Sequence, residues 1–307
     1  MIKTRKKIYL LVASDLPILQ KRDWLTSMPE LGIIADVEPV VVFNEPSSDI
    51  TPSIWLKLSD EIAQRFSQAD GFVILHDIDN ILYTASALSF LLQNLTKPII
   101  ITGPYQKRLD GKNPEIRANI INACQAANYS FGEVALMFGN RLLRANQSFL
   151  TTEESLNVFN APPSGILGRI DFSIRIFEKN ILTAKTKLQV SKNLNSNIEI
   201  ININPVLDLK SLNKRLADRD GVVINAGNNQ SLPRNLIFLL DKVISDKPVV
   251  IWTKQSNQPM IISNNLILVN NMGWESTVLK LMWSLTQADK PKKIKELMFK
   301  DLAGETL

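Results

Sequence analysis

The sequence predicts an α/β protein with mostly parallel sheets, arranged as two three-layer α/β/α domains. Short apolar runs, typical of buried parallel strands, alternate with longer segments of helical period. A complete βαβ unit occupies residues 70–103, in which an apolar strand at 72–75 leads into a helix and then into a second apolar strand at 99–102. A polar segment rich in Lys, Asn and Ser, residues 182–197, separates two such series and is interpreted as a linker.

The helix of the central unit is predicted to begin at Ile81, because apolar residues recur from there at helical spacing through Leu95. Asp79 and Asn80 stand just before it, where a residue that caps a helix N-terminus belongs. Pro98 then ends the helix. The loop at 76–80 therefore lies at the carboxyl end of a strand, which is where open α/β sheets bind ligands.

The first domain is predicted to span residues 1–181 and the second 198–307. In both, each strand is an apolar run bounded by turn-forming or charged residues, and each helix repeats apolar residues every three or four positions. The predicted strands are 8–13, 37–43, 72–75, 99–102, 133–138, 199–203, 221–225, 248–253 and 266–269. The predicted helices are 52–67, 81–95, 113–127, 207–216, 232–245 and 274–286.

Composition narrows the class of protein. The chain has 307 residues, of which 45% are hydrophobic and 21% charged, so a sizeable core is expected and disorder is not. Its one cysteine, Cys124, excludes an internal disulfide, fits a reducing compartment, and lies in an Ala-rich helical stretch where a buried packing role is expected. With one His and one Cys, no metal site is predicted, and without a Gly-rich phosphate motif no cofactor is predicted.

The net charge of +5 is partly concentrated at the two ends of the chain. The basic N-terminus precedes an apolar run at 8–13, which is shorter than the ~7–15 residues of a secretory signal and the ~20 of a membrane span. We therefore expect a cytoplasmic protein without membrane contact. The lysines near the other end lack interleaved aromatic residues, so a solvated tail is expected rather than a nucleic-acid surface. These lysines are Lys290, Lys292, Lys293 and Lys295.

Residues 83–92 (YTASALSFLL) and the segment from Lys97-Pro98 through Thr102-Gly103 form a helix-and-strand pattern with a distinctive sequence. This pattern resembles the site helix, and the strand that follows it, of the type I L-asparaginase family. Further similar segments are MPEL at 28–31, NRLLRAN at 140–146 and KLMW at 280–283, so the resemblance spans nearly the whole chain. It implies an asparaginase-like two-domain fold.

The resemblance places aliphatic residues where the family carries its reactive groups. The family's strand ending in Thr-Gly-Gly-Thr-Ile, whose second Thr is the nucleophile, matches a stretch in which Leu16 takes that position. The family's His-Gly-Thr-Asp-Thr matches residues 76–80, which puts Ile78 at the relay threonine and Asp79 at the aspartate. An ungapped count places Leu150 at the relay lysine. An aliphatic side chain neither attacks a carbonyl nor transfers a proton, so we expect amide hydrolysis to be lost.

The resemblance supports retained ligand binding better than it supports retained catalysis. Asp79 matches the family residue that holds the substrate ammonium group, and Ser47 matches one partner of its α-carboxylate. Ser47, Asp79 and Asn80 are the predicted ligand-binding residues, although Asp79 would serve equally well as a helix cap alone. Asp77, in place of a family glycine, and Asp15 add negative charge that would repel a carboxylate ligand.

The alternative hypothesis is a working L-asparaginase type amidohydrolase, converting asparagine to aspartate and ammonia through substitute residues. Ser14 and His76 end two strands that the fold places side by side, and acidic residues lie nearby, so a Ser-His-Asp arrangement is conceivable. His76, however, matches a family position that is already His without being the base. A lone His at a strand end is usually structural.

The resemblance also implies assembly. The family forms dimers or tetramers in which a neighbour's second domain closes the site, so we expect a homo-oligomer or a hetero-oligomer with an active relative. The leading hypothesis is a non-catalytic subunit that interacts with a partner or binds a small amino-acid-like ligand. A third possibility is an amidotransferase subunit acting on charged tRNA. Members of that kind carry an extra N-terminal domain, and seven residues precede the first predicted strand here.

Overall fold

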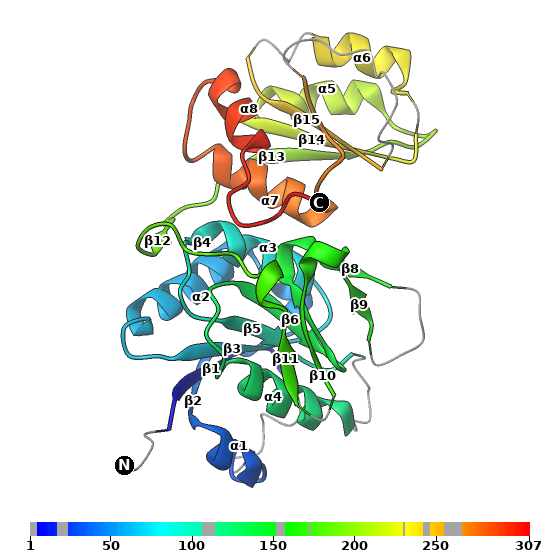
Figure 1. Cartoon of the computed structure of the whole chain (residues 1–307). Coiled ribbons are helices and arrows are strands. Elements are labelled where there is room, and N and C mark those ends of the chain that lie inside the picture. The colour runs from blue at the N-terminus through cyan, green and yellow to red at the C-terminus, as the bar shows by residue number, and fades with distance from the viewer. Residues whose placement is uncertain are drawn as a thin grey trace. The chain divides into compact units, whose positions relative to one another are not determined.

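The computed structural model describes residues 5–16, 24–105, 114–151, 157–171, 173–229, 231–241, 246–254 and 266–307. The chain forms two compact units, Met1–Lys192 with Leu307, and Asn193–Thr306. Both are layered α/β structures, as predicted (Figure 1).

The first unit is built on an eight-stranded sheet of order β11-β10-β7-β6-β5-β3-β1-β2. The strands from β2 to β6 in this order run parallel, and β7, β10 and β11 continue the sheet in antiparallel fashion. The parallel strands, apart from the edge strand β2, are almost wholly buried, which explains their continuous apolar sequences. The strands are β1 (Lys7–Ala13), β2 (Asp36–Phe43), β3 (Gly71–His76), β5 (Ile99–Thr102), β6 (Val134–Phe138), β7 (Arg141–Arg144), β10 (Ile166–Ile170) and β11 (Ile174–Ile176).

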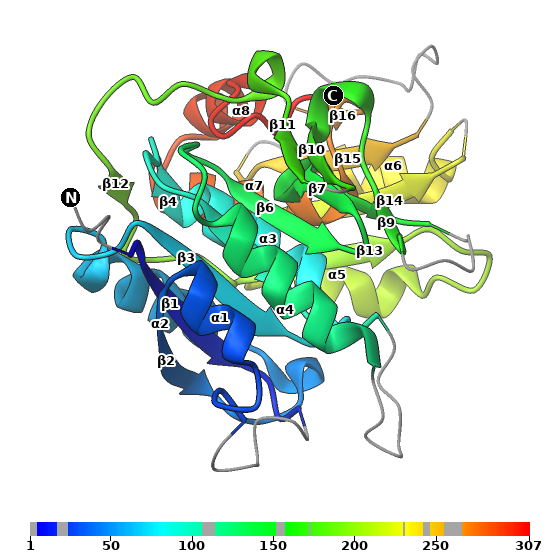
Figure 2. The same cartoon turned by 60° about the horizontal axis from the view of Figure 1, so that its bottom comes forward.

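Helices cover both faces of this sheet. On one face α1 (Pro29–Ile34) and α4 (Pro114–Ala126) pack on alternate residues of β1 and β3, and Figure 2 shows both in front of the sheet. Cys124 of α4 is fully buried in this layer, as predicted, and its burial raises the pKa of the thiol to about 12. On the other face lie α2 (Pro52–Arg65) and α3 (Ile81–Leu91), joined by a hydrogen bond from Trp55 Nε1 to Thr84 Oγ1.

Two small ribbons complete the first unit. β4 (Leu92–Gln93) pairs antiparallel with β12 (Gln189–Val190), which lies inside the segment interpreted as a linker. This pairing ties residues up to Lys192 to the first unit. β8 (Phe149–Leu150) pairs with β9 (Phe159–Asn160). Short 3₁₀ turns occupy η2 (Ser47–Asp49), η3 (Ala145–Gln147), η4 (Pro163–Gly165) and η5 (Glu178–Asn180).

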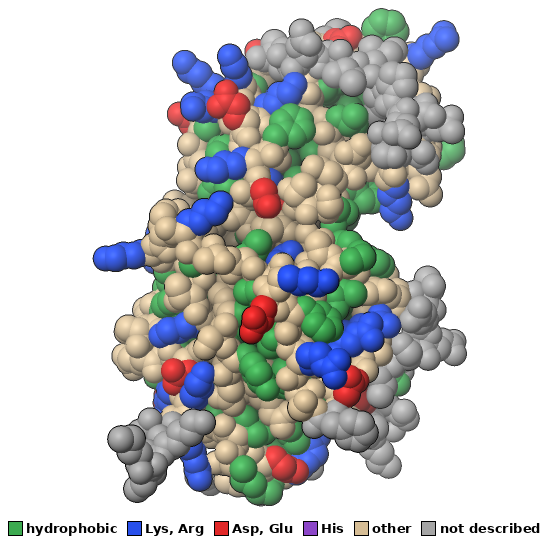
Figure 3. Space-filling model, viewed as in Figure 1, with side chains coloured by type: hydrophobic (Ala, Val, Ile, Leu, Met, Phe, Trp, Pro, Cys, Tyr) green, Lys and Arg blue, Asp and Glu red, His purple; other side chains and the backbone are tan. Residues whose placement is uncertain are grey.

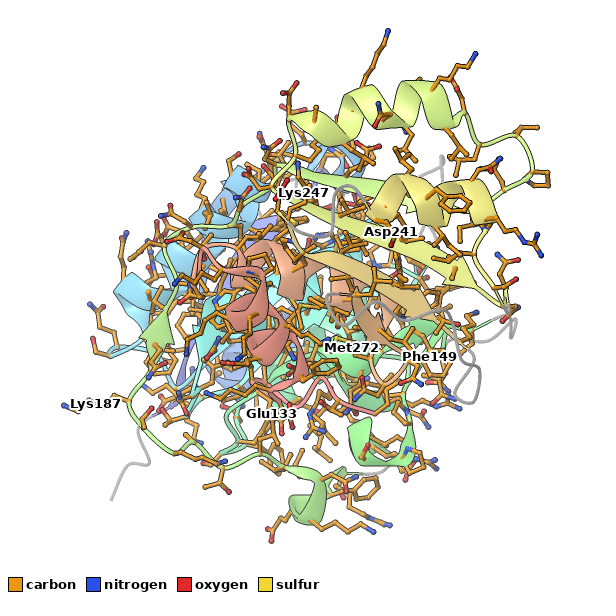
Figure 4. All side chains as sticks on the ribbon, turned by 90° about the horizontal axis from the view of Figure 1, so that it is seen from above. Glu133, Phe149, Lys187, Asp241, Lys247 and Met272 are labelled. Atoms are coloured by element: carbon orange, nitrogen blue, oxygen red, sulfur yellow. The ribbon has the colours of Figure 1, made fainter. Side chains whose placement is uncertain are left out.

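The second unit has a four-stranded sheet of order β13-β14-β15-β16, in which all strands run parallel. Apolar residues of α5 and α6 form one core with the sheet, and α7 packs on β14 and β15. Lys247, labelled in Figure 4, stabilises the end of α5 by donating to the carbonyls of Leu216 and Arg219. The elements are β13 (Ile198–Asn202), α5 (Leu209–Ala217), β14 (Gly221–Gly227), α6 (Arg234–Asp241), β15 (Val249–Thr253), β16 (Leu266–Val269), α7 (Trp274–Ser284) and α8 (Pro291–Phe299).

The prediction of a solvated lysine-rich tail is wrong. Residues 291–299 form helix α8, whose Ile294 and Met298 are buried while Lys292 and Lys293 are exposed. The sequence holds apolar residues four apart between the lysines, which is the spacing of one helix face. Below the helix, the fully buried Lys280 of α7 pairs with Glu305 at 2.5 Å and donates to the carbonyl of Lys300 at 2.7 Å. The end of the chain is therefore part of the packed unit.

Within the described residues no helix is both long and apolar enough to cross a membrane. On the face shown in Figure 3, Lys and Arg side chains are dispersed among acidic, apolar and neutral ones rather than gathered in one place.

Candidate functional site

The candidate site lies at the carboxyl ends of β1 and β3. These strands are neighbours in the sheet, and their register pairs Ala13 with His76. The residues that follow, Ser14 and Asp77, are therefore side by side, as the order of the strands predicts. Both side chains are buried although each belongs to a loop.

A buried hydrogen-bond cluster links Ser14, Asp77 and Ser47. The Ser14 hydroxyl donates to Asp77 Oδ1 at 2.6 Å, and the backbone N–H of Ser47 donates to Asp77 Oδ2 at 3.2 Å. Ser14 is 1% exposed, and Asp77 and Ser47 are both 0% exposed. The Asp77 side chain thus points inward and links its own loop to the loops of Ser14 and Ser47. From the sequence, Asp77 was expected only to add a negative charge beside the site. The sequence offered no direct signal for this pairing.

The three predicted ligand-binding residues are brought together by the same loops. The Ser47 hydroxyl donates to the backbone carbonyl of Asp79 at 2.9 Å, and Asn80 Nδ2 donates to the carbonyl of Ser47 at 3.2 Å. Ser47 is buried, whereas the side chains of Asp79 and Asn80 are exposed. The Ser47 hydroxyl is thus engaged within the protein, and the acidic group of Asp79 remains open to solvent.

The prediction that Asp79 or Asn80 caps α3 through its side chain is wrong. Asn80 is the residue at the N-cap position, but it has a left-handed backbone with φ of 56° and makes no capping hydrogen bond with its side chain. Asn tolerates this conformation better than most residues, which explains its place at the turn. Asp79 lies one position earlier, in the turn itself. Its negative charge still lies near the N-terminus of α3, where the helix dipole favours an anion.

His76 is held by other groups than Ser14. Its Nδ1 lies 2.6 Å from the carbonyl of Asp77 and its Nε2 lies 2.8 Å from Thr84 Oγ1. Burial lowers the pKa of His76, against the opposing influence of the Asp77 carbonyl and charge. Both ring nitrogens are therefore occupied, and the Ser14 hydroxyl is directed to Asp77. The substitute Ser-His-Asp arrangement considered from the sequence is not assembled here.

The aliphatic residues of the site have three different environments. Leu16 is fully buried and belongs to the core cluster that includes Val12 and Leu75. Ile78 is half-buried in the turn before α3. Leu150 is 58% exposed on β8, beside Phe149, which is labelled in Figure 4. Because β8 pairs with β9, Leu150 lies on a separate two-stranded ribbon, whereas Leu16 and Ile78 lie in the segments that follow β1 and β3.

Two further residues position the site without having been predicted. A Cβ atom at Gly103 would lie 1.8 Å from the carbonyl oxygen of His76, so only glycine allows the end of β5 to approach β3 this closely. Thr84, in the first turns of α3, accepts the hydrogen bond of Trp55 as well as contacting His76. The role of Gly103 could have been suspected from its position directly after the strand at 99–102. No feature of the sequence indicated the role of Thr84, since its partners Trp55 and His76 come from separate elements.

The second unit carries an open cavity of about 310 Å³. It lies at the carboxyl ends of β13 and β14 and is lined mainly by asparagines and small residues, namely Asn202, Ile203, Asn225, Ala226, Gly227, Asn228 and Asn229. Across the described part of the chain, no three or more His, Cys, Asp or Glu side chains are grouped as metal ligands.

Comparison with known proteins gives consistent matches. The family model "Asparaginase, N-terminal" matches residues 10–182. L-asparaginase 1 of Escherichia coli is 30% identical over 281 residues, covering 84% of this chain and 81% of that protein. L-asparaginase of Dirofilaria immitis is 30% identical over 280 residues, covering 84% of this chain and 47% of that protein. The chain thus spans about half the length of the latter relative.

Two further matches extend this picture. A Glutamyl-tRNA(Gln) amidotransferase subunit of Thermococcus kodakarensis is 26% identical over 306 residues, covering 91% of this chain and 68% of that protein. The crystal structure of L-asparaginase I from Vibrio cholerae superposes with a TM-score of 0.77 at 28% identity, covering 99% of this chain and 100% of that one.

Proposed function

Since the chain belongs to the asparaginase family, we propose that it is a non-catalytic member, which interacts with a partner or binds a small amino-acid-like ligand. Membership supplies the fold, and function depends on the groups present in the site. The observation that carries the proposal is the closed Ser14–Asp77–Ser47 cluster, in which buried polar groups at the strand ends are bonded to one another.

The alignment of the family motifs with Leu16, Ile78 and Leu150 supports the loss of hydrolysis. A hydroxyl nucleophile needs a base within hydrogen-bond reach. Leu16 supplies no hydroxyl and is packed in the core, where it takes part in the stability of the sheet instead. Leu150 lies on the separate ribbon, exposed. A relay through these three positions has neither a group that attacks nor one that carries a proton.

The exposed side chains of Asp79 and Asn80 support ligand binding at the rim of the site. A carboxylate at this place suits a ligand with an ammonium group, and the amide of Asn80 offers a further polar contact. Because Ser47 is engaged with the carbonyl of Asp79, it acts in this proposal by holding the loop that presents Asp79. Replacing Asp79 by Ala is expected to weaken amino-acid binding at least tenfold, as measured by titration calorimetry with L-asparagine and L-aspartate.

The proposal includes a homo-oligomer, or a hetero-oligomer with an active relative. The Thermococcus kodakarensis relative is itself named as a subunit, which supports an assembly role for this fold. A cytoplasmic location is also proposed, because the one cysteine is a buried free thiol rather than half of a disulfide. Sedimentation of the purified chain, alone and mixed with an active relative, tests the assembly.

The deciding experiment is ammonia release from L-asparagine and L-glutamine by the purified full chain. The Escherichia coli relative, assayed in parallel, serves as the positive control. We expect no turnover above a matched blank without protein. Turnover that disappears in Ser14→Ala or in Asp79→Ala would overturn the proposal, because it would require a working site at these residues.

One observation favours the second candidate, an active amidohydrolase. Ser14 and Asp77 form a hydroxyl–carboxylate pair at 2.6 Å, and a carboxylate is able to act as a general base. The pair is buried, however, so a substrate would first have to displace the Ser47 loop. If this candidate holds, Asp77→Asn abolishes the ammonia release found for the unmodified chain while leaving the fold intact by circular dichroism.

A further inference from the structure

We propose that Asp77 is an internal ligand of the site. Its carboxylate fills a carboxylate-binding cradle formed by the Ser14 hydroxyl and the Ser47 N–H, so that a free carboxylate is excluded from the cradle itself. The inference rests on the proposed function in one respect, since it describes a site that turns over no substrate. It specifies the chemical class that the cradle takes, namely a small carboxylate.

The geometry at Asp77 is that of a bound carboxylate. Each of its two oxygens receives a donor from a different loop, Ser14 Oγ at 2.6 Å and Ser47 N at 3.2 Å. The shorter distance falls within the ~2.5–2.7 Å typical of an O–H group that donates to an ionised carboxylate. Neither donor belongs to the loop that carries Asp77, so the carboxylate reaches into a site made by other segments.

Both donors are positioned by bonds that do not involve the Asp77 side chain. Ser14 Oγ also accepts the N–H of Leu16 at 3.2 Å, and the Ser14 N–H donates to the carbonyl of Phe43 at 3.0 Å. The Ser47 turn is closed by its own backbone, with the N–H of Ile50 donating to the Ser47 carbonyl at 3.2 Å. A cradle held in this way is expected to keep its shape when the carboxylate is removed.

Two other buried carboxylates, Glu133 and Glu305, show what a purely structural pair looks like. Glu133 is bound by Arg144 through two nitrogens, at 2.6 and 3.1 Å, and Glu305 is bound by Lys280 (Glu133 is labelled in Figure 4). In these pairs a cation compensates the charge. At Asp77 a hydroxyl and a backbone N–H, each from another loop, donate to the two carboxylate oxygens. Such neutral donors are those with which proteins commonly hold an anionic ligand.

The test is chemical rescue of Asp77→Gly. This substitution deletes a carboxymethyl group, and acetate is the corresponding free molecule. We expect the full-length variant to unfold at a lower temperature than the unmodified chain. Sodium acetate should raise that temperature saturably, and sodium chloride at equal ionic strength should not, because acetate binds only the folded state. The unmodified chain should show no acetate-specific shift.

Two controls decide whether the rescue uses the cradle. Asp49→Gly removes an exposed carboxylate from the Ser47 turn, and it should show no acetate-specific shift. Adding Ser14→Ala to Asp77→Gly should weaken acetate binding at least tenfold. Ser47→Pro, added in the same way, removes the N–H donor where the preceding residue has ψ of 139°, a value compatible with a following proline. Its matched control, Ser47→Ala, keeps the N–H and should retain the rescue.

The proposal is overturned if acetate stabilises Asp77→Gly no more than Asp49→Gly, or if the Ser14→Ala double variant is rescued equally well. If Asp77→Gly does not fold, Asp77→Ser with formate as the smaller probe replaces it, and the same two outcomes apply. Because the readout is thermal unfolding, it does not depend on turnover. Ammonia release by the unmodified chain would thus refute the proposed function without deciding this experiment.

Discussion

Two buried carboxylates, Asp77 in the first unit and Glu305 in the second, illustrate two ways of removing a charge from water. Glu305 meets the ammonium group of Lys280 at 2.5 Å and accepts the N–H groups of Leu302 and Ala303. Asp77 receives a hydroxyl and a backbone N–H at the ends of two parallel strands. Glu305 fixes the end of the chain, whereas Asp77 occupies the place where this class of sheet binds ligands.

The difference shows how a site is distinguished from a structural pair. A paired buried charge has one suitable partner, and substituting either member damages the fold. A hydroxyl and a backbone N–H that hold a carboxylate from another loop form a cradle able to accept another anion when that carboxylate is removed. Substitutions at the two carboxylates and their partners should lower stability in both places. At Asp77 a small free carboxylate should reverse the loss, and at Glu305 it should not.

The largest expected effect comes from Lys280→Met. Removing the ammonium group leaves Glu305 buried without its cation, which should lower the free energy of unfolding by about 3–5 kcal/mol. Desolvation by burial raises the pKa of Glu305, but attraction to Lys280 and hydrogen bonds outweigh it, so the pKa is lowered overall. Its stabilising contribution is therefore present above about pH 4.5 and is lost as the pH falls through the lowered pKa.

Urea unfolding of the purified chain measures this effect. Lys293→Met is the matched control, because Lys293 makes an exposed pair with Glu296 and should change stability by less than about 0.5 kcal/mol. The double variant Lys280→Met/Glu305→Leu should recover most of the loss, since an apolar pair replaces both charges. A single variant as stable as the unmodified chain would refute the structural role of the pair.

The next largest effect is expected for Ser14→Ala, which deprives Asp77 of the hydroxyl donor at 2.6 Å. Leaving a buried acceptor without one of its hydrogen bonds costs about 1–3 kcal/mol. Ser59→Ala is a control of identical chemistry, because Ser59 is equally buried but its hydroxyl has no hydrogen-bond partner in the described structure. It should be neutral or slightly stabilising. Equal losses in the two variants would show that the Ser14–Asp77 bond contributes nothing.

A third effect concerns pH and His76, the only histidine of the chain. Burial lowers its pKa below the ordinary 6.5, so the unfolded chain binds a proton more readily than the folded one. Stability should therefore fall as the pH drops below about 6.5, by at most about 1.4 kcal/mol per pH unit. Urea unfolding between pH 5 and pH 7 measures how the free energy of unfolding changes with pH, in the unmodified chain and in His76→Gln. A slope that is unchanged in the variant would show that His76 is not its source.

The sequence predicted the strands better than the contacts of the loops that follow them. The adjacency of Ser14 and His76 followed from strand order, because apolar runs and crossover helices leave few possible arrangements of a parallel sheet. The inward rotation of Asp77 could not be predicted, since a loop aspartate is ordinarily solvated and its donors lie 63 and 30 residues away. Thr84, which binds His76 and Trp55, was missed because its partners come from different elements.

Two predictions of local structure were wrong, namely the side-chain cap of α3 and the lysine-rich tail. In each case the same residues are compatible with more than one local conformation. Asp79 and Asn80 both favour the N-cap, but the chain enters α3 through a left-handed Asn80, which displaces Asp79 into the turn. The lysines at 290–295 suggested a tail, whereas Ile294 and Met298 between and after them are enough to form a buried face of α8. The run of lysines is the more conspicuous feature of this segment, but the spacing of its apolar residues determines that it forms a helix.

The smallest expected effect is that of Asp79→Ala on stability. The side chain is exposed and does not cap α3 through a hydrogen bond, so only its charge near the helix dipole is lost, worth about 0.3–1 kcal/mol. Adding salt should reduce this difference further. Urea unfolding at low and high ionic strength measures it. A loss above about 1.5 kcal/mol would mean that Asp79 holds the loop, and a reduced affinity for amino acids in this variant would then reflect damage to the fold rather than loss of a ligand contact.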